Sequence, residues 1–183
     1  MKNHLVLTFL LGASISTFAT PTQLEILGLI PGISDADQVQ QASVDPTRRS
    51  ESSARLEIGG YKIPCALTMQ NGKFSALTCF TGKGTKRSEL YTEASNFEVQ
   101  TILVAGFTKK FGKPDSTKAK TVRTGMGVEY EQTVVVWTDT QGNRLELMSI
   151  FDTVNAGVII LESAEHIKRS AQERMEEEKK KKF

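Results

Sequence analysis

Two cysteines, Cys65 and Cys79, constrain the fold of this chain more than any other feature. They lie in two runs of alternating apolar and polar residues, separated by the hairpin signal Asn71–Gly72. A two-residue turn would aim the two sulfurs at opposite faces, because strand side chains alternate with period two. A three-residue loop, 71–73, places Cys65 opposite Cys79. We therefore expect this longer loop and a cross-strand disulfide, with two free buried thiols as the alternative.

Residues 1–19 have the pattern of a cleavable secretory signal: Lys2, an apolar run over 5–15, and small residues before Thr20. The run is shorter than a membrane-spanning helix needs, so a retained anchor is the alternative reading. No cysteine follows the cleavage point, so lipoprotein acylation is not expected. The sequence predicts a periplasmic or secreted chain, in an oxidising compartment that suits a disulfide.

Composition indicates a folded chain without a strong electrostatic bias. Hydrophobic residues make up 39% and charged residues 24% of the 183 residues, and the formal net charge is +2. This balance is typical of globular domains and supplies no bulk attraction for nucleic acid or an anionic membrane. We expect no nucleic-acid partner and no transmembrane segment in the mature chain.

The first predicted unit spans residues 20–82. Ser34, with Asp37 three residues later, predicts a capped helix ending before Pro46. About three strands follow, two of which form the cysteine hairpin. A polar connector from Thr81 to Thr92 separates this unit from the next.

The second predicted unit, residues 93–163, repeats this order. Ser95 and Glu98 predict the start of a helix that ends at Gly112 and Pro114. A polar loop and three β-rich runs follow (128–137, 144–151 and 157–161). Residues 164–183 form a charged C-terminal helix or tail that begins at Ser163. The predicted fold class is α+β, with two tandem helix-plus-antiparallel-sheet units and a charged C-terminal helix.

Two short motifs carry a resemblance to known proteins. Residues 28–34, Gly-Leu-Ile-Pro-Gly-Ile-Ser, and residues 111–114, Phe-Gly-Lys-Pro, are similar to the helix entry and helix ending of small bacterial envelope proteins. That family has the fold of the outer-membrane β-barrel assembly lipoprotein (SmpA/OmlA-like) and of the β-lactamase inhibitor protein. The chain departs from it in lacking the lipoprotein cysteine and a glycine before Pro46. The resemblance implies protein binding through a curved sheet.

Few residues are available for catalysis. His4 leaves with the signal, so a Ser/His/Asp or Cys/His triad would have to use His166, which we expect at an exposed helix start. A disulfide removes both thiolates from metal binding, and we expect no metal and no cofactor. Glu129 and Glu131 alternate along one predicted strand. They are the candidate carboxylate pair if the chain is a hydrolase that acts on a glycan.

The predicted function is an exported, non-enzymatic protein-binding module that acts as an envelope assembly, accessory or inhibitory factor. Its partner is expected to be another envelope protein. The alternative is a cell-wall glycan binder or a carboxylate-dependent hydrolase. Aromatic residues with a polar group are candidate partner contacts, with a place in the core as the other option for each: Trp137, Tyr130 and Tyr61. A possible anion contact is formed by Lys83, Lys86 and Arg87.

Overall fold

The computed structural model describes residues 20–45, 52–82, 86–87, 95–123, 127–151 and 153–181. The fold is a mixed α+β fold, as predicted. Its helices are α1 (Ala36–Ala42), α2 (Asn96–Phe111) and α3 (Ala164–Lys180). The predicted signal, residues 1–19, lies outside the described residues.

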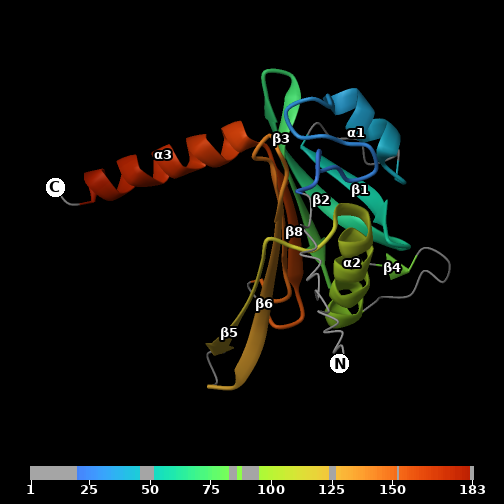
Figure 1. The fold of residues 1–183 in the computed structure, drawn as a ribbon, viewed down its shortest axis with the longest axis vertical. Coiled ribbons are helices and arrows are strands. Elements are labelled where there is room, and N and C mark those ends of the chain that lie inside the picture. The colour runs from blue at the N-terminus through green and yellow to red at the C-terminus, as the bar shows by residue number, and fades with distance from the viewer. Residues whose placement is uncertain are drawn as a thin grey trace, which may run out of the picture.

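The strands form one antiparallel sheet with the order β1-β2-β3-β8-β7-β6-β5, and β4 pairs with β2. Helices α1 and α2 lie against one face, whereas α3 projects away on the other side (Figure 1). Strands β3 and β8, which are far apart in the sequence, are neighbours, and this pair joins the strands before α2 and those after it in one sheet. Their bounds are β1 (Ser53–Ile58), β2 (Tyr61–Gln70), β3 (Lys73–Thr81), β4 (Lys86–Arg87), β5 (Ser116–Arg123), β6 (Glu129–Thr138), β7 (Arg144–Met148) and β8 (Gly157–Glu162).

The hydrophobic core lies between the sheet and the α1–α2 layer. Alternate strand residues point into it, as period-two alternation requires. Helix α2 contributes one stripe at three- and four-residue spacing, which closes the core over the middle of the sheet. The buried members of this stripe are Val99, Leu103, Phe107 and Phe111, and those of the second-half strands include Val135, Trp137, Leu145, Leu147, Ile159 and Leu161.

The cysteine hairpin forms the predicted disulfide through a different turn. Gln70 pairs with Lys73, so the loop has two residues, Asn71 and Gly72, both with positive φ. The predicted three-residue loop is therefore wrong. Met69 and Thr68 pair with Phe74 and Ala76, which leaves Ser75 as an extra residue in β3. This β-bulge shifts the register by one residue and brings Cys65 opposite Cys79.

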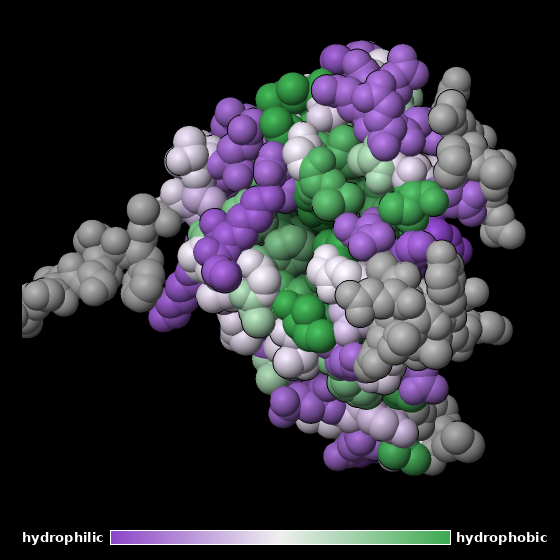
Figure 2. Space-filling model, turned by 90° about the vertical axis from the view of Figure 1, so that its right-hand side faces the viewer, coloured by the Kyte–Doolittle hydropathy of each residue, from purple (hydrophilic) through white to green (hydrophobic). Residues whose placement is uncertain are grey.

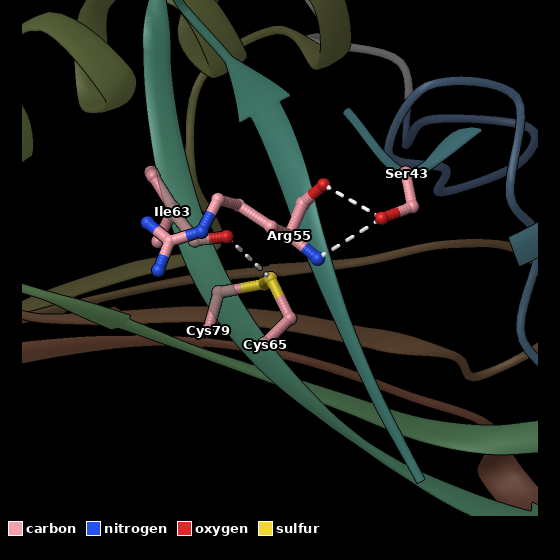
Figure 3. The surroundings of a disulfide bond; sticks show 5 residues. All are labelled: Ser43, Arg55, Ile63, Cys65 and Cys79. Carbon is pink, nitrogen blue, oxygen red and sulfur yellow. Dashed lines mark hydrogen bonds between the residues drawn. A yellow bond between two sulfur atoms is a disulfide. The ribbon is translucent and has the colours of Figure 1, made fainter. Parts of the chain in front are cut away.

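The segment after α1 covers the outer edge of β1 near this disulfide (Figure 3). Ser43 Oγ lies 3.3 Å from both the amide nitrogen and the carbonyl oxygen of Arg55. Val44 N–H also donates to Arg55 O at 2.9 Å. The first edge of the sheet is thus partly paired, which limits its access to other strands.

Helix α1 begins one residue later than predicted. Asp35 is the N-cap, and its side chain and that of Gln38 form the capping box. Ser34 is buried instead, and its Oγ accepts from Ile30 N–H. The hydrogen bond from Gln38 N–H lowers the pKa of Asp35, because it stabilises the carboxylate.

Strand β5 replaces most of the predicted polar loop after Pro114. It pairs along its whole length with β6 and ends the sheet on that side. Six of its eight residues are exposed. Its sequence lacks apolar alternation, so its strand conformation depends on pairing with β6. The start of α3 agrees with prediction, since Ser163 Oγ accepts from His166 N–H.

Candidate functional site

An apolar groove of about 330 Å³ lies between α2 and the second half of the sheet. We call it the α2 groove. Its floor is formed by β6 and β7, one wall by α2, and β5 lies at its outer side. Its lining consists of Phe97, Gln100, Thr101, Val104, Thr117, Thr133, Val135, Leu147 and Ser149.

Buried polar contacts fix the α2 wall of this groove. Asn96 Nδ2 donates to the carbonyl oxygen of Ser149, and Gln100 Nε2 donates to Thr81 Oγ1 at 3.0 Å. All four residues are less than 10% exposed. Gly157 packs against the Asn96 and Gln100 side chains, and a Cβ atom at this position would come within 2.6 Å of both. The N-terminal turn of α2 is therefore held against the sheet by satisfied hydrogen bonds, which makes the groove a preformed feature.

The surface of the groove is mostly apolar, and its polar lining residues are uncharged. Val135 and Leu147 form a floor that is 4% and 1% exposed, whereas Phe97 at the rim is 51% exposed. Figure 2 shows apolar residues gathered in the middle of the face that carries α1 and α2. No lining residue is ionisable. The site can therefore hold apolar side chains, with a few hydroxyl and amide groups to orient them.

Phe97 was not among the predicted site residues. It lies in the first turn of α2 but outside the buried series that continues through Val99, Leu103 and Phe107. An aromatic residue displaced from the apolar stripe of a helix is exposed unless something else covers it. That displacement is the signal by which the sequence could have indicated this site.

The structure places Trp137 in the core. The side chain is fully buried, and its indole Nε1–H donates to Gly112 O at 2.9 Å. Its ring meets Phe107 edge-on at 6.2 Å between centroids. Of the two roles considered for Trp137, this geometry supports the core role, and we leave it out of the candidate binding surface.

The two tyrosines lie apart from one another and outside the groove lining. Tyr61 is 4% exposed at the start of β2, and its hydroxyl donates to Glu98 Oε1 at 2.9 Å. Tyr130 is half-buried on β6, opposite Val122. Tyr61 therefore links α2 to the sheet, and Tyr130 remains a predicted partner contact near the β5–β6 hairpin.

The predicted anion contact falls mainly outside what the structure describes. Lys83 lies outside the described residues. Lys86 and Arg87 form β4, whose backbone pairs with Lys62 and Tyr61 of β2. The anion contact remains a prediction.

His166 is more enclosed than expected. Its side chain is only 15% exposed, with Nδ1 3.4 Å from Ser75 Oγ and Nε2 3.7 Å from Glu162 Oε1. The expectation of an exposed helix-end residue is wrong, because the bulged Ser75 and the end of β8 surround the ring. Ser75 is 3% exposed and its Oγ also contacts Thr68 O at 3.1 Å. Arg169 Nη2 lies nearer to the same ring nitrogen, at 3.1 Å from Nδ1. His166 thus lies between the first turn of α3 and the end of the sheet.

The carboxylates of the alternative reading lie at the tip of the β5–β6 hairpin. Glu129 forms an ion pair with Arg123, and Glu131 is exposed two residues further along β6. Neither lines the α2 groove. Within the described ranges, no cluster of three or more His, Cys, Asp or Glu side chains is arranged to hold a metal ion.

A second hollow, of about 450 Å³, lies where the described chain begins. It is lined by residues 20–23, Glu25, Lys110 and Phe111. Its lining includes the ion pair between Lys110 and Glu25, whose Nζ and Oε1 atoms are 2.7 Å apart.

Comparison with protein-family models, curated proteins and solved structures finds no match for this chain. In the part of the chain that the structure describes, no helix is both long enough and apolar enough to span a membrane.

Proposed function

We propose that this chain is an exported, non-enzymatic module that binds a segment of another envelope protein in the α2 groove. The observation that carries the proposal is the combination of an apolar floor, an exposed aromatic rim at Phe97 and a lining without ionisable groups. Aromatic side chains beside an apolar pocket are typical anchors of protein interfaces. The groove volume is at the lower end of the range for ligand pockets, which suits a few partner side chains.

The lining favours binding over the alternative reading. Glycoside hydrolysis requires two carboxyl groups on either side of the scissile bond, and the groove lining contains none. The predicted pair, Glu129 and Glu131, lies on the exposed end of β6, with one member engaged by Arg123.

The two-unit interpretation and the family resemblance remain part of this proposal. In their support, α1 precedes the antiparallel strands β1–β3, and α2 precedes β5–β8. The α2 groove lies between a helix and the sheet, whereas the resemblance implies binding through a curved sheet. The resemblance therefore supports protein binding in general and does not select the face.

The test is a photo-crosslink from within the groove. A benzoylphenylalanine at position 97 should form a discrete protein adduct in the native envelope, whereas the same group at Ile33 should not. Ile33 is a matched control because it is 49% exposed and outside the groove. For the partner so identified, Phe97→Ala should weaken binding about tenfold or more, with an unchanged melting temperature. Adducts to peptidoglycan alone, or equal adducts from both positions, contradict the proposal.

A further inference from the structure

Strand β5 is an accessible edge of the sheet. Within the described residues its only strand neighbour is β6, so the backbone groups of its other side have no strand partner. The opposite edge differs, because Ser43 and Val44 bond to β1. In Figure 1 β5 lies at the margin of the fold, away from α1. Exposed edges of this kind accept an additional strand from a peptide.

The charge of β5 restricts which strand can be added. Residues 116–123 include three basic residues and no acidic one. Arg123 is engaged by Glu129, but Lys118 and Lys120 are exposed, and their cross-strand neighbours on β6, Val134 and Gln132, are uncharged. Edge lysines oppose the pairing of two identical edges, since lysine would face lysine. A second copy of this chain is therefore disfavoured at β5, and an acidic strand is favoured.

The two faces of β5 differ in chemistry. Lys118 and Lys120 share the face turned away from α2, whereas Thr117 and Ala119 share the other. Thr117 also lines the α2 groove. A strand next to β5 would present alternate residues to these two faces, about 5 Å from their β5 neighbours. Its acidic residues would lie beside the lysines, and its apolar residues would lie beside the groove.

We propose that β5 takes up an extended segment of the partner protein in which acidic and apolar residues alternate. The inference rests on the proposed function, that the chain binds a segment of another protein, and names the conformation and sequence pattern of that segment. Backbone pairing would supply affinity, and the alternation of side chains would supply specificity.

The probe is a fluorescein-labelled peptide, Glu-Val-Glu-Thr-Glu-Val-Glu, measured by polarisation against the mature protein. A peptide with lysine in place of each glutamate should bind at least tenfold more weakly, and so should a block-sequence peptide of the same composition. Methylation of backbone nitrogens at one set of alternate positions should abolish binding, and methylation at the other set should leave it unchanged. Equal binding of the block peptide, or indifference to both methylations, overturns the inference.

Charge reversal provides the matched variants. Lys118→Glu/Lys120→Glu should bind the acidic peptide at least tenfold more weakly and should gain affinity for the lysine peptide. Lys168→Glu/Lys179→Glu on α3 makes the same change in net charge and should bind as the wild type does. If the acidic peptide fails to bind while the position-97 adduct forms, the inference is wrong and the proposed function stands. If the peptide binds and no protein adduct forms, edge pairing is supported and the groove proposal fails.

Discussion

The indole N–H of Trp137 donates a hydrogen bond of 2.9 Å to the carbonyl oxygen of Gly112. Gly112 caps the C-terminal end of α2 with a positive φ of 86°. Strand β6 and helix α2 are thereby joined at a point where the helix leaves carbonyl groups without intrahelical partners. The Trp137 side chain is thus part of the core and also supplies a hydrogen-bond donor to a carbonyl group at the end of α2, the helix that forms the groove wall.

This relationship predicts a graded response to substitution. Trp137→Ala should lower the free energy of unfolding by about 3–5 kcal/mol, because it leaves a large cavity. Trp137→Phe keeps most of the volume but leaves the Gly112 carbonyl unpaired, and should cost about 1–3 kcal/mol. Urea unfolding, monitored by circular dichroism, measures the free energy of unfolding of both variants. Partner affinity of the folded Phe variant should match that of the wild type; a loss of affinity without a loss of stability would show that Trp137 is a contact residue.

Removal of the disulfide should destabilise the chain without changing its fold. The bridge joins residues that are 14 positions apart, and closing such a loop contributes about 3 kcal/mol in the chain-entropy model. Cys65→Ala/Cys79→Ala should therefore lower the free energy of unfolding by about that amount. A reducing agent should lower the denaturation midpoint of the wild type and leave that of the variant unchanged. Equal midpoints for the oxidised wild type and the variant would contradict this.

Two glycines offer a matched test of the buried hydrogen bonds that Asn96 and Gln100 form between α2 and the sheet, which we call the amide clamp. In Gly157→Ala the new Cβ would lie within 2.7 Å of Asn96 Oδ1, Gln100 Nε2 and Thr81 Oγ1, so we expect a loss of about 1–3 kcal/mol. Gly106→Ala, on an exposed side of the same helix, meets nothing within 4 Å and should gain about 0.5–1 kcal/mol. The melting temperature should fall for Gly157→Ala and rise for Gly106→Ala. An unchanged melting temperature for Gly157→Ala would show that the amide clamp can shift to make room for the new Cβ.

Acid should weaken the cap of α1. The pKa of Asp35 is lowered from 3.8, mainly by the hydrogen bond from Gln38 N–H and further by Lys73 at 3.6 Å. A folded-state pKa below the unfolded value contributes stability above pH 3.8, and this stability is lost as the pH falls through the folded pKa. Asp35→Asn keeps an acceptor at the cap but does not titrate. The melting temperature of the wild type should exceed that of the variant at neutral pH, and the difference should vanish in acid; a constant difference would contradict this.

The parts of the fold that the sequence predicts are those with local signals. The caps at Ser95 and Ser163 and the end of α2 at Gly112 agree with prediction, because each depends on residues within one helical turn. The cap of α1 was assigned to Ser34 instead of Asp35, since both residue types suit the position and burial of Ser34 by the tertiary structure decides between them.

The non-local features were harder to predict. The sequence predicts the disulfide through a three-residue loop, whereas the structure has a two-residue turn and a bulge at Ser75 that brings the two cysteines opposite one another. Bulges have no short sequence signal comparable to Asn-Gly. The polar residues of β5 predict a loop, whereas in the structure they pair with β6 along the whole strand. The α2 groove is also a non-local feature, because its lining comes from α2, β5, β6 and β7, which meet only in the folded chain.

The pairing of β3 with β8 has a kinetic consequence. Thr78 lies opposite Ile160, so the centre of the sheet joins segments that are far apart in sequence. The loop between them must close before this pairing returns any free energy, which is typical of slowly folding chains with high contact order. Until Gly157–Glu162 is in place, β3 has an unpaired, largely apolar edge. During that interval the nascent sheet is most open to association with other chains, and a chaperone would have most effect there.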